Sequence, residues 1–139
     1  MQADNFTWKS SVFLCIGSYE LDLHSYYIFQ SVNYNVSSRV VTFNWVRRSA
    51  EYVPSDIPSV VKIELKGVDR FKVFSRDSKM PFTEDDCLSS FGYDCDEDWA
   101  DGQFWTDSEP EDHWWWSFSF QSEAEFLVQG EKAHAEISC

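Results

Sequence analysis

Apolar and polar residues alternate along several segments of this chain, as they do in strands that bury one face and expose the other. In the clearest case, the segment 61–66, valine, isoleucine and leucine alternate with lysine and glutamate. The same alternation runs through 19–24, 32–36 and 41–45. The first half of the chain therefore predicts antiparallel strands with one buried face.

Turn-forming residues separate these segments. The sequence Gly-Val-Asp at 67–69 predicts a reversal into a further strand over 71–74. Pro54 and Pro58 mark 52–59 as a linker, because proline lacks the N–H group that a central strand needs.

The last quarter of the chain contains three more alternating segments, 114–120, 124–128 and 133–137. The connections between them are short enough for hairpins. We therefore expect a three-stranded antiparallel meander at the end of the chain.

One helix is predicted after the strand at 71–74. Thr83 is a suitable N-cap, and the acidic residues at 84–86 would lie in the first turn, where the helix dipole favours them. Gly92 is placed to end this helix after about Phe91. The predicted fold is mainly β, an antiparallel sandwich or strongly curved sheet of about seven to eight strands with one short helix.

The chain has 139 residues, of which 43% are hydrophobic and 18% aromatic. This composition supports a single domain over 1–139 with a core of its own. No apolar run approaches the roughly 20 residues of a membrane-spanning helix, and the N-terminus lacks the features of a secretion signal. We therefore expect a cytoplasmic protein with no membrane partner. The cysteines, predicted to be free thiols because they are too few for a disulfide scaffold, are Cys15, Cys87, Cys95 and Cys139.

The net charge of −13 is concentrated in the segment 84–112, which holds twelve carboxylates and no lysine or arginine. The rest of the chain is almost neutral, with twelve acidic and eleven basic side chains. The acidic segment also contains the aromatic residues Phe91, Tyr93, Trp99, Phe104 and Trp105. Disordered acidic tails normally lack aromatic residues, so we predict a partly ordered insertion. Its charge argues against nucleic acid as a direct partner and favours a basic protein.

The sequence offers little support for catalysis or metal binding. The run 94–98 resembles the start of a calcium loop, but Trp99 and Trp105 stand where an EF-hand needs glycine and glutamate. The cysteines and histidines match no zinc spacing, and no nucleophile motif or phosphate-binding glycine loop is present. Nothing distinguishes two of the twelve carboxylates as a glycosidase pair. We therefore predict no enzymatic activity, no catalytic residues, no metal and no cofactor.

Two stretches of the chain resemble a known family. The sequence WSFSFQSEAEFLVQGEKAHAEI at 116–137 resembles the closing hairpins of small bacterial immunity proteins from polymorphic toxin systems. The stretch 61–88 has a similar character. It contains a strand, a turn at Gly67, a second strand, and then Pro81 before an acidic segment. The resemblance implies a cytosolic, acidic, single-domain inhibitor that binds and neutralises a cognate toxin domain. It assigns no functional residue by position.

Tryptophan residues leave a second function open. Alternation places Trp114 and Trp116 in the core and leaves Trp115 half exposed. A carbohydrate-binding sandwich would instead use exposed rings, with Trp99, Trp105 and Trp115 as the candidates and calcium held by the acidic residues.

The hypothesis that we favour is a non-enzymatic binding protein that presents its acidic segment to a basic toxin domain, which could be a nuclease. An acidic DNA-mimic inhibitor is a further alternative, although its charge should spread over a longer surface. The predicted partner-binding residues are Asp94, Asp96, Glu97, Asp98, Trp99, Asp101, Trp105, Asp107, Glu109, Glu111 and Asp112.

Overall fold

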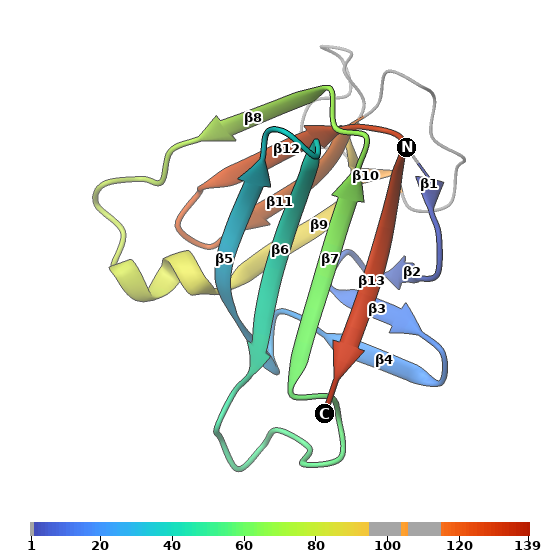
Figure 1. The fold of residues 1–139 in the computed structure, drawn as a ribbon. Helices are drawn as coiled ribbons and strands as arrows, with labels where there is room; N and C mark the ends of the chain where they lie inside the picture. The colour runs from blue at the N-terminus through green and yellow to red at the C-terminus, as the bar shows by residue number, and fades with distance from the viewer. Residues whose placement is uncertain (1, 95–103, 106–114) are drawn as a thin grey trace.

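The computed structural model confirms a mainly β, sandwich-like fold (Figure 1). It describes residues 2–94, 104–105 and 115–139. The described strands form two five-stranded sheets and one three-stranded sheet, and the helical structure is a short 3-10 helix. Within the described residues, no helix has the length and apolar character needed to cross a membrane.

The first five-stranded sheet contains the longest strands of the molecule. Its order is β1 (Gln2–Ala3), β13 (Lys132–Ser138), β7 (Val60–Lys66), β6 (Val40–Arg47) and β5 (Tyr27–Asn35). Neighbouring strands are antiparallel except β1, which runs parallel to β13. Val61, Ile63 and Leu65 of β7 are fully buried between polar neighbours, which confirms the alternation predicted from the sequence.

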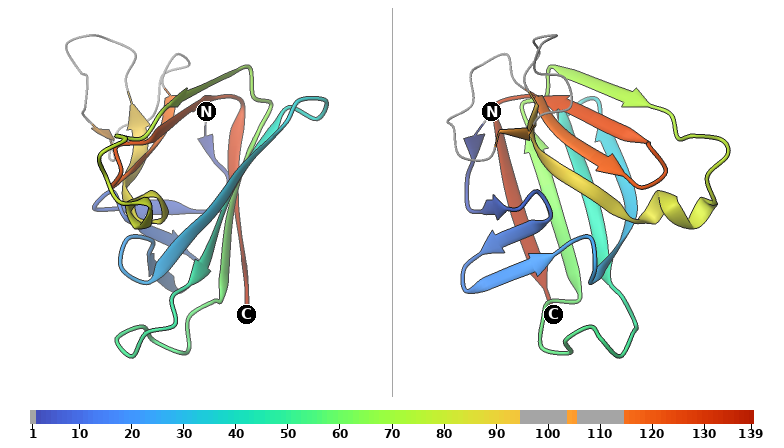
Figure 2. Two further views of the ribbon diagram at one scale, coloured as in Figure 1. Left: turned by 90° about the vertical axis from the view of Figure 1, so that its left-hand side faces the viewer. Right: turned by 180° about the vertical axis from the view of Figure 1, so that it is seen from behind.

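The second five-stranded sheet is antiparallel throughout. Its order is β10 (Phe104–Trp105), β9 (Leu88–Asp94), β11 (Trp115–Phe120), β12 (Glu125–Gln129) and β8 (Arg70–Phe74). The third sheet is formed by β2 (Thr7–Lys9), β3 (Phe13–Ile16) and β4 (Tyr19–Asp22). The left-hand view of Figure 2 shows the first two sheets facing each other.

Aromatic side chains fill the space between the two large sheets. The ring of Phe43 on β6 stacks on Phe118 of β11 with centroids 4.0 Å apart, and both side chains are fully buried. The third sheet joins the same core through Trp8, whose ring lies 4.7 Å from Trp116 and 4.8 Å from Tyr93. The three sheets therefore share one continuous hydrophobic cluster.

Two short connections carry the chain from one large sheet to the other. Residues 67–69 join β7 to β8, and residues 130–131 join β12 to β13, which pairs with β7. The two connections lie side by side, because the N–H of Glu131 donates to the carbonyl of Lys66 and the N–H of Asp69 to that of Gln129. Such corners close the sandwich. The turn at 67–69 does lead into the predicted strand, but β8 joins the other sheet instead of reversing within the first. The predicted meander is wrong in its third strand, since β13 also changes sheets.

The helix prediction is also wrong in extent. The 3-10 helix η1 spans Phe82–Asp86, with Pro81 rather than Thr83 at its N-cap. Residues expected to complete a longer helix form β9 instead, where Phe91 is fully buried between the sheets. The core therefore needs this segment as a strand, and that packing overrides the helix signals at 83–86.

Candidate functional site

The acidic segment predicted from the sequence begins inside the fold. Its first part is η1 and β9, so 84–94 belongs to the sandwich rather than to an insertion. Asp94 is half-buried at the end of β9, and Trp105 lies in β10. The other predicted partner-binding residues lie outside the described residues, and they are Asp96, Glu97, Asp98, Trp99, Asp101, Asp107, Glu109, Glu111 and Asp112.

The strand pairing fixes where the undescribed acidic stretches are attached. Asp94 faces Trp115 of β11 on one side and Phe104 of β10 on the other. The chain therefore leaves and re-enters the second sheet at the same end of neighbouring strands. The residues between these points, 95–114, carry eight carboxylates and no lysine or arginine. This charge is thus tethered to one end of the sandwich.

Trp115 is buried, contrary to the prediction that it is half exposed. Only 2% of its surface is accessible, and Arg70 and Lys72 of β8 lie over its ring at 4.8 Å and 4.9 Å from the centroid. Trp116 is fully buried, as predicted, and Trp114 lies outside the described residues. A ring covered by two cations offers no stacking surface for a sugar.

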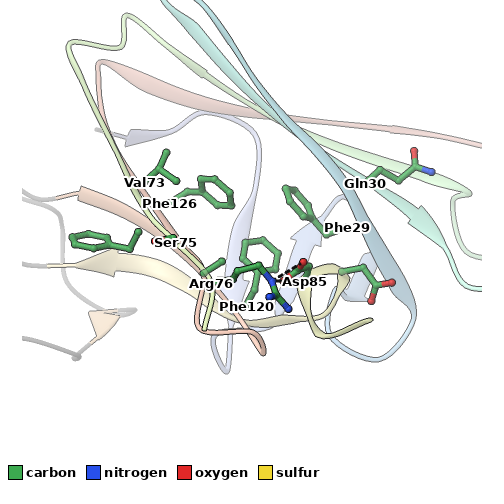
Figure 3. Close-up of a pocket in the computed structure, with 11 residues that line it drawn as sticks. Phe29, Gln30, Val73, Ser75, Arg76, Asp85, Phe120 and Phe126 are labelled. Atoms are coloured by element: carbon green, nitrogen blue, oxygen red, sulfur yellow. Dashed lines mark hydrogen bonds and ion pairs between the residues drawn. The ribbon is translucent and has the colours of Figure 1, made fainter. Parts of the chain in front are cut away.

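A cleft that the sequence did not reveal opens between β5 and β8 (Figure 3). Its volume is about 380 Å³, and Phe29, Phe120 and Phe126 supply its aromatic walls. Val73 and Phe74 of β8 stand at the cleft with 58% and 51% of their surfaces exposed. The cleft lies between edge strands, since β5 ends the first sheet and β8 ends the second.

Two ion pairs lie at the cleft end formed by η1. Arg76 donates from Nε to both carboxylate oxygens of Asp85, at 2.8 Å and 3.0 Å, and from Nη2 to the carbonyl of Met80. These bonds from Arg76 hold the pKa of the Asp85 carboxyl below its ordinary value of 3.8. Asp86 lies 4.0 Å from Arg48. In each pair the aspartate side chain is 39% exposed and the arginine side chain 22% or 23% exposed, so both carboxylates remain partly accessible at this rim.

The described residues contain no group of three or more histidine, cysteine, aspartate or glutamate side chains placed to hold a metal ion. No protein-family model, curated protein or solved structure matches this chain.

Cys87 and His24 form a close pair that does not make a nucleophile. His24 Nδ1 lies 2.7 Å from the carbonyl oxygen of Leu88 and 3.5 Å from Cys87 Sγ. A carbonyl only accepts, so Nδ1 carries the proton and cannot take one from the thiol. Burial raises the pKa of the Cys87 thiol, which keeps it protonated at neutral pH. As predicted, Cys87 is a free thiol, as are Cys15 and Cys139.

Proposed function

We propose that this chain is a non-enzymatic binding protein that neutralises a basic partner, and specifically an immunity protein that inhibits a cognate bacterial toxin. The observation that carries the proposal is the concentration of charge. Eight carboxylates unbalanced by any lysine or arginine lie within 95–114, between two anchor points on adjacent strands. Acidic residues concentrated in this way complement a basic protein groove.

A nuclease toxin is the partner that best explains this design. Its active site holds the phosphates of its substrate with basic side chains, and carboxylates can occupy the same groove. Complementary charge would also raise the association rate constant toward about 10⁸ to 10⁹ M⁻¹s⁻¹ at low salt. Trp99 and Trp105, which lie among the acids, would supply the desolvated anchors that dominate binding energy.

The carbohydrate-binding alternative receives less support. The four tryptophans with described side chains are Trp8, Trp45, Trp115 and Trp116, and none of them is exposed. A sugar platform needs open aromatic faces, and the only candidate ring with a described side chain, Trp115, is covered by two cations.

The first test of the proposal is whether a gene beside that of this chain encodes a large protein with a variable C-terminal domain, which would then be the toxin domain used in binding assays. Co-expression with this chain should restore growth of bacteria that make that domain, and the purified proteins should form a complex in isothermal titration calorimetry. Reversing four acids, Asp96→Lys, Glu97→Lys, Asp98→Lys and Asp101→Lys, should weaken the complex. The fold should stay intact and the thermal midpoint should stay level or rise, because crowded like charges are removed.

The matched control reverses four exposed acids elsewhere, Glu20→Lys, Glu51→Lys, Asp56→Lys and Asp69→Lys. It makes the same change in net charge, so it should leave affinity near that of the wild type if position decides binding. Equal losses of affinity in both variants would mean that the acidic segment contributes only through the net charge of the protein. Full protection by the first variant would contradict the proposal.

A further inference from the structure

We infer that the cleft between β5 and β8 is a second docking site, which takes an extended protein segment carrying a bulky apolar side chain flanked by lysine or arginine. This inference concerns residues outside the acidic segment 95–114. The cleft would be a second contact of the proposed basic partner, so the identity of the occupant rests on the proposed function. The existence of the site does not depend on that function.

The first observation is where apolar surface is exposed. Val73, Phe74 and Phe82 are 58%, 51% and 81% exposed, and all three lie on β8 or in the segment that follows it. Val73 and Phe74 line the cleft, while Phe82 packs on the Arg76 guanidinium at 4.6 Å. Clustered apolar surface of this kind marks interaction sites. A patch that extends beyond the cavity fits a protein segment better than a small ligand.

The second observation concerns the two edge strands that border the cleft. On β5 the pairing with β6 shifts register between Phe29 and Ser31, so Gln30 forms a bulge at the cleft. A bulge hinders the addition of another strand at that edge. The ladder between β8 and β12 is regular over all five residues of β8, and no described strand pairs with the other edge of β8. The edge of β8 is therefore the one open to strand addition.

The geometry then places the incoming side chains. A strand added along β8 would lie between β8 and β5, so alternate side chains would point toward Phe126, Phe120 and Phe29, which Figure 3 shows around the cavity. An apolar side chain in this position would be buried against aromatic rings, as interface anchors commonly are.

The third observation sets the charge of the occupant. Asp85, Asp86 and Arg76 line the cleft, so carboxylates outnumber guanidinium groups there by two to one, and both carboxylates are partly exposed. Basic residues beside the apolar anchor would reach these carboxylates at the rim. An acidic segment would instead meet like charge.

The test uses a fluorescently labelled peptide of seven residues, in which lysine alternates with phenylalanine and valine. Its affinity is measured by anisotropy, and its site is mapped by amide chemical-shift changes in the full chain. We expect saturable binding that perturbs the amides of Val73 and Ala124, and weaker binding of the same peptide with glutamate in place of lysine. Absence of saturable binding, or equal binding of the two peptides, would overturn the inference.

Matched variants identify the site. Val73→Ser should weaken peptide binding about tenfold, because it removes apolar surface at the cleft. Val36→Ser changes a valine outside the cleft that is also more than half exposed (72%), and it should leave affinity unchanged. Asp86→Asn should weaken binding roughly threefold, the scale of a partly exposed ion pair. Equal affinity of Val73→Ser and the wild type would contradict the inference.

Other occupants give different results. Displacement of the peptide by the small dye anilinonaphthalene sulfonate at equal concentration would assign the cleft to a small molecule. Sedimentation as a dimer that Val73→Ser dissociates would assign it to a second copy of the chain. Either result overturns the inference.

The variant with four reversed acids separates this inference from the proposed function. This variant should no longer bind the toxin domain but should still bind the peptide. Loss of the peptide in that variant would show that the lysines bind the acidic segment rather than the cleft. Retention of the toxin domain together with normal peptide binding would instead count against the proposed function alone.

Discussion

The central strands β6 and β11 and the edge strand β8 have similar apolar content but very different exposure. Phe43 on β6 and Phe118 on β11 each lie between neighbouring strands and are fully buried. Val73 and Phe74 lie on the edge strand β8 and are more than half exposed. The difference arises from position in the sheet rather than from hydrophobicity. Burial at the centres of the sheets supplies stability, while the edge strand β8 leaves apolar surface exposed, which is typical of interaction sites.

The largest expected effect comes from breaking the central stack. Phe118→Ala removes a ring that lies 4.0 Å from that of Phe43 and should lower the free energy of unfolding by about 3 to 5 kcal/mol. Phe74→Ala, the edge counterpart, should change it by less than about 0.5 kcal/mol. Urea denaturation followed by tryptophan fluorescence measures both. Similar losses in the two variants would refute the division between centre and edge.

A smaller effect is expected at the corner where two connections cross between the large sheets. Gly67 has a φ of +65°, and a Cβ there would lie 2.6 Å from the side chain of Glu131. Gly17 has a similar φ of +58° with open space around it. Gly67→Ala should cost about 1 to 2 kcal/mol from backbone strain, plus the repacking of Glu131.

Thermal unfolding of Gly67→Ala and Gly17→Ala separates these two contributions. The difference in stability between the two variants should disappear when Glu131→Ala is added to Gly67→Ala. Both positions then pay only a similar cost for an alanine at positive φ. A Gly67→Ala variant as stable as the wild type would mean that the corner does not constrain the sandwich.

The smallest expected effect is the pH dependence of the rim. The pKa of Asp85 is lowered in the folded state, so its ion pair stabilises the fold at pH values above 3.8. This contribution is lost as the pH falls below 3.8 through the lower folded pKa. Asp85→Asn should therefore be less stable than the wild type at neutral pH, and the difference should shrink at the acidic end of a denaturation series. A difference that does not change with pH would assign the effect to packing around Arg76.

The fold was predictable where burial follows local alternation. The segment 61–65 is such a case, because every second residue contacts the core whichever strands become its neighbours. The predictions failed where residues distant in sequence decide which side chains are buried and which strands pair. Arg70 and Lys72 lie over the ring of the buried Trp115, and the strand that follows Gly130 pairs with β7 rather than with β12. Neither contact leaves a local signal.

The cleft at the candidate site also depends on residues that are distant in sequence. The cleft brings together Phe29, Val73 and Phe126 from three separate parts of the chain, so no motif encodes it. The one sequence signal for the cleft is the pair of adjacent apolar residues at 73–74. A strand with one buried face should alternate apolar and polar residues, so one of the two must be exposed. Charge at 95–114 was evident from the sequence, since it depends on composition and not on folding.

The most direct test of the proposed function is the binding kinetics with the toxin domain, measured on a sensor surface at two salt concentrations. Raising the salt should mainly slow association, because exposed charges are screened within about 8 Å at 0.15 M. Trp99→Ala or Trp105→Ala should mainly speed dissociation and cost at least about 2 kcal/mol, while Tyr52→Ala, which changes an exposed ring elsewhere, should do neither. Association rates that ignore salt, together with dissociation rates that neither tryptophan variant changes, would contradict a partner-binding role for the acidic segment.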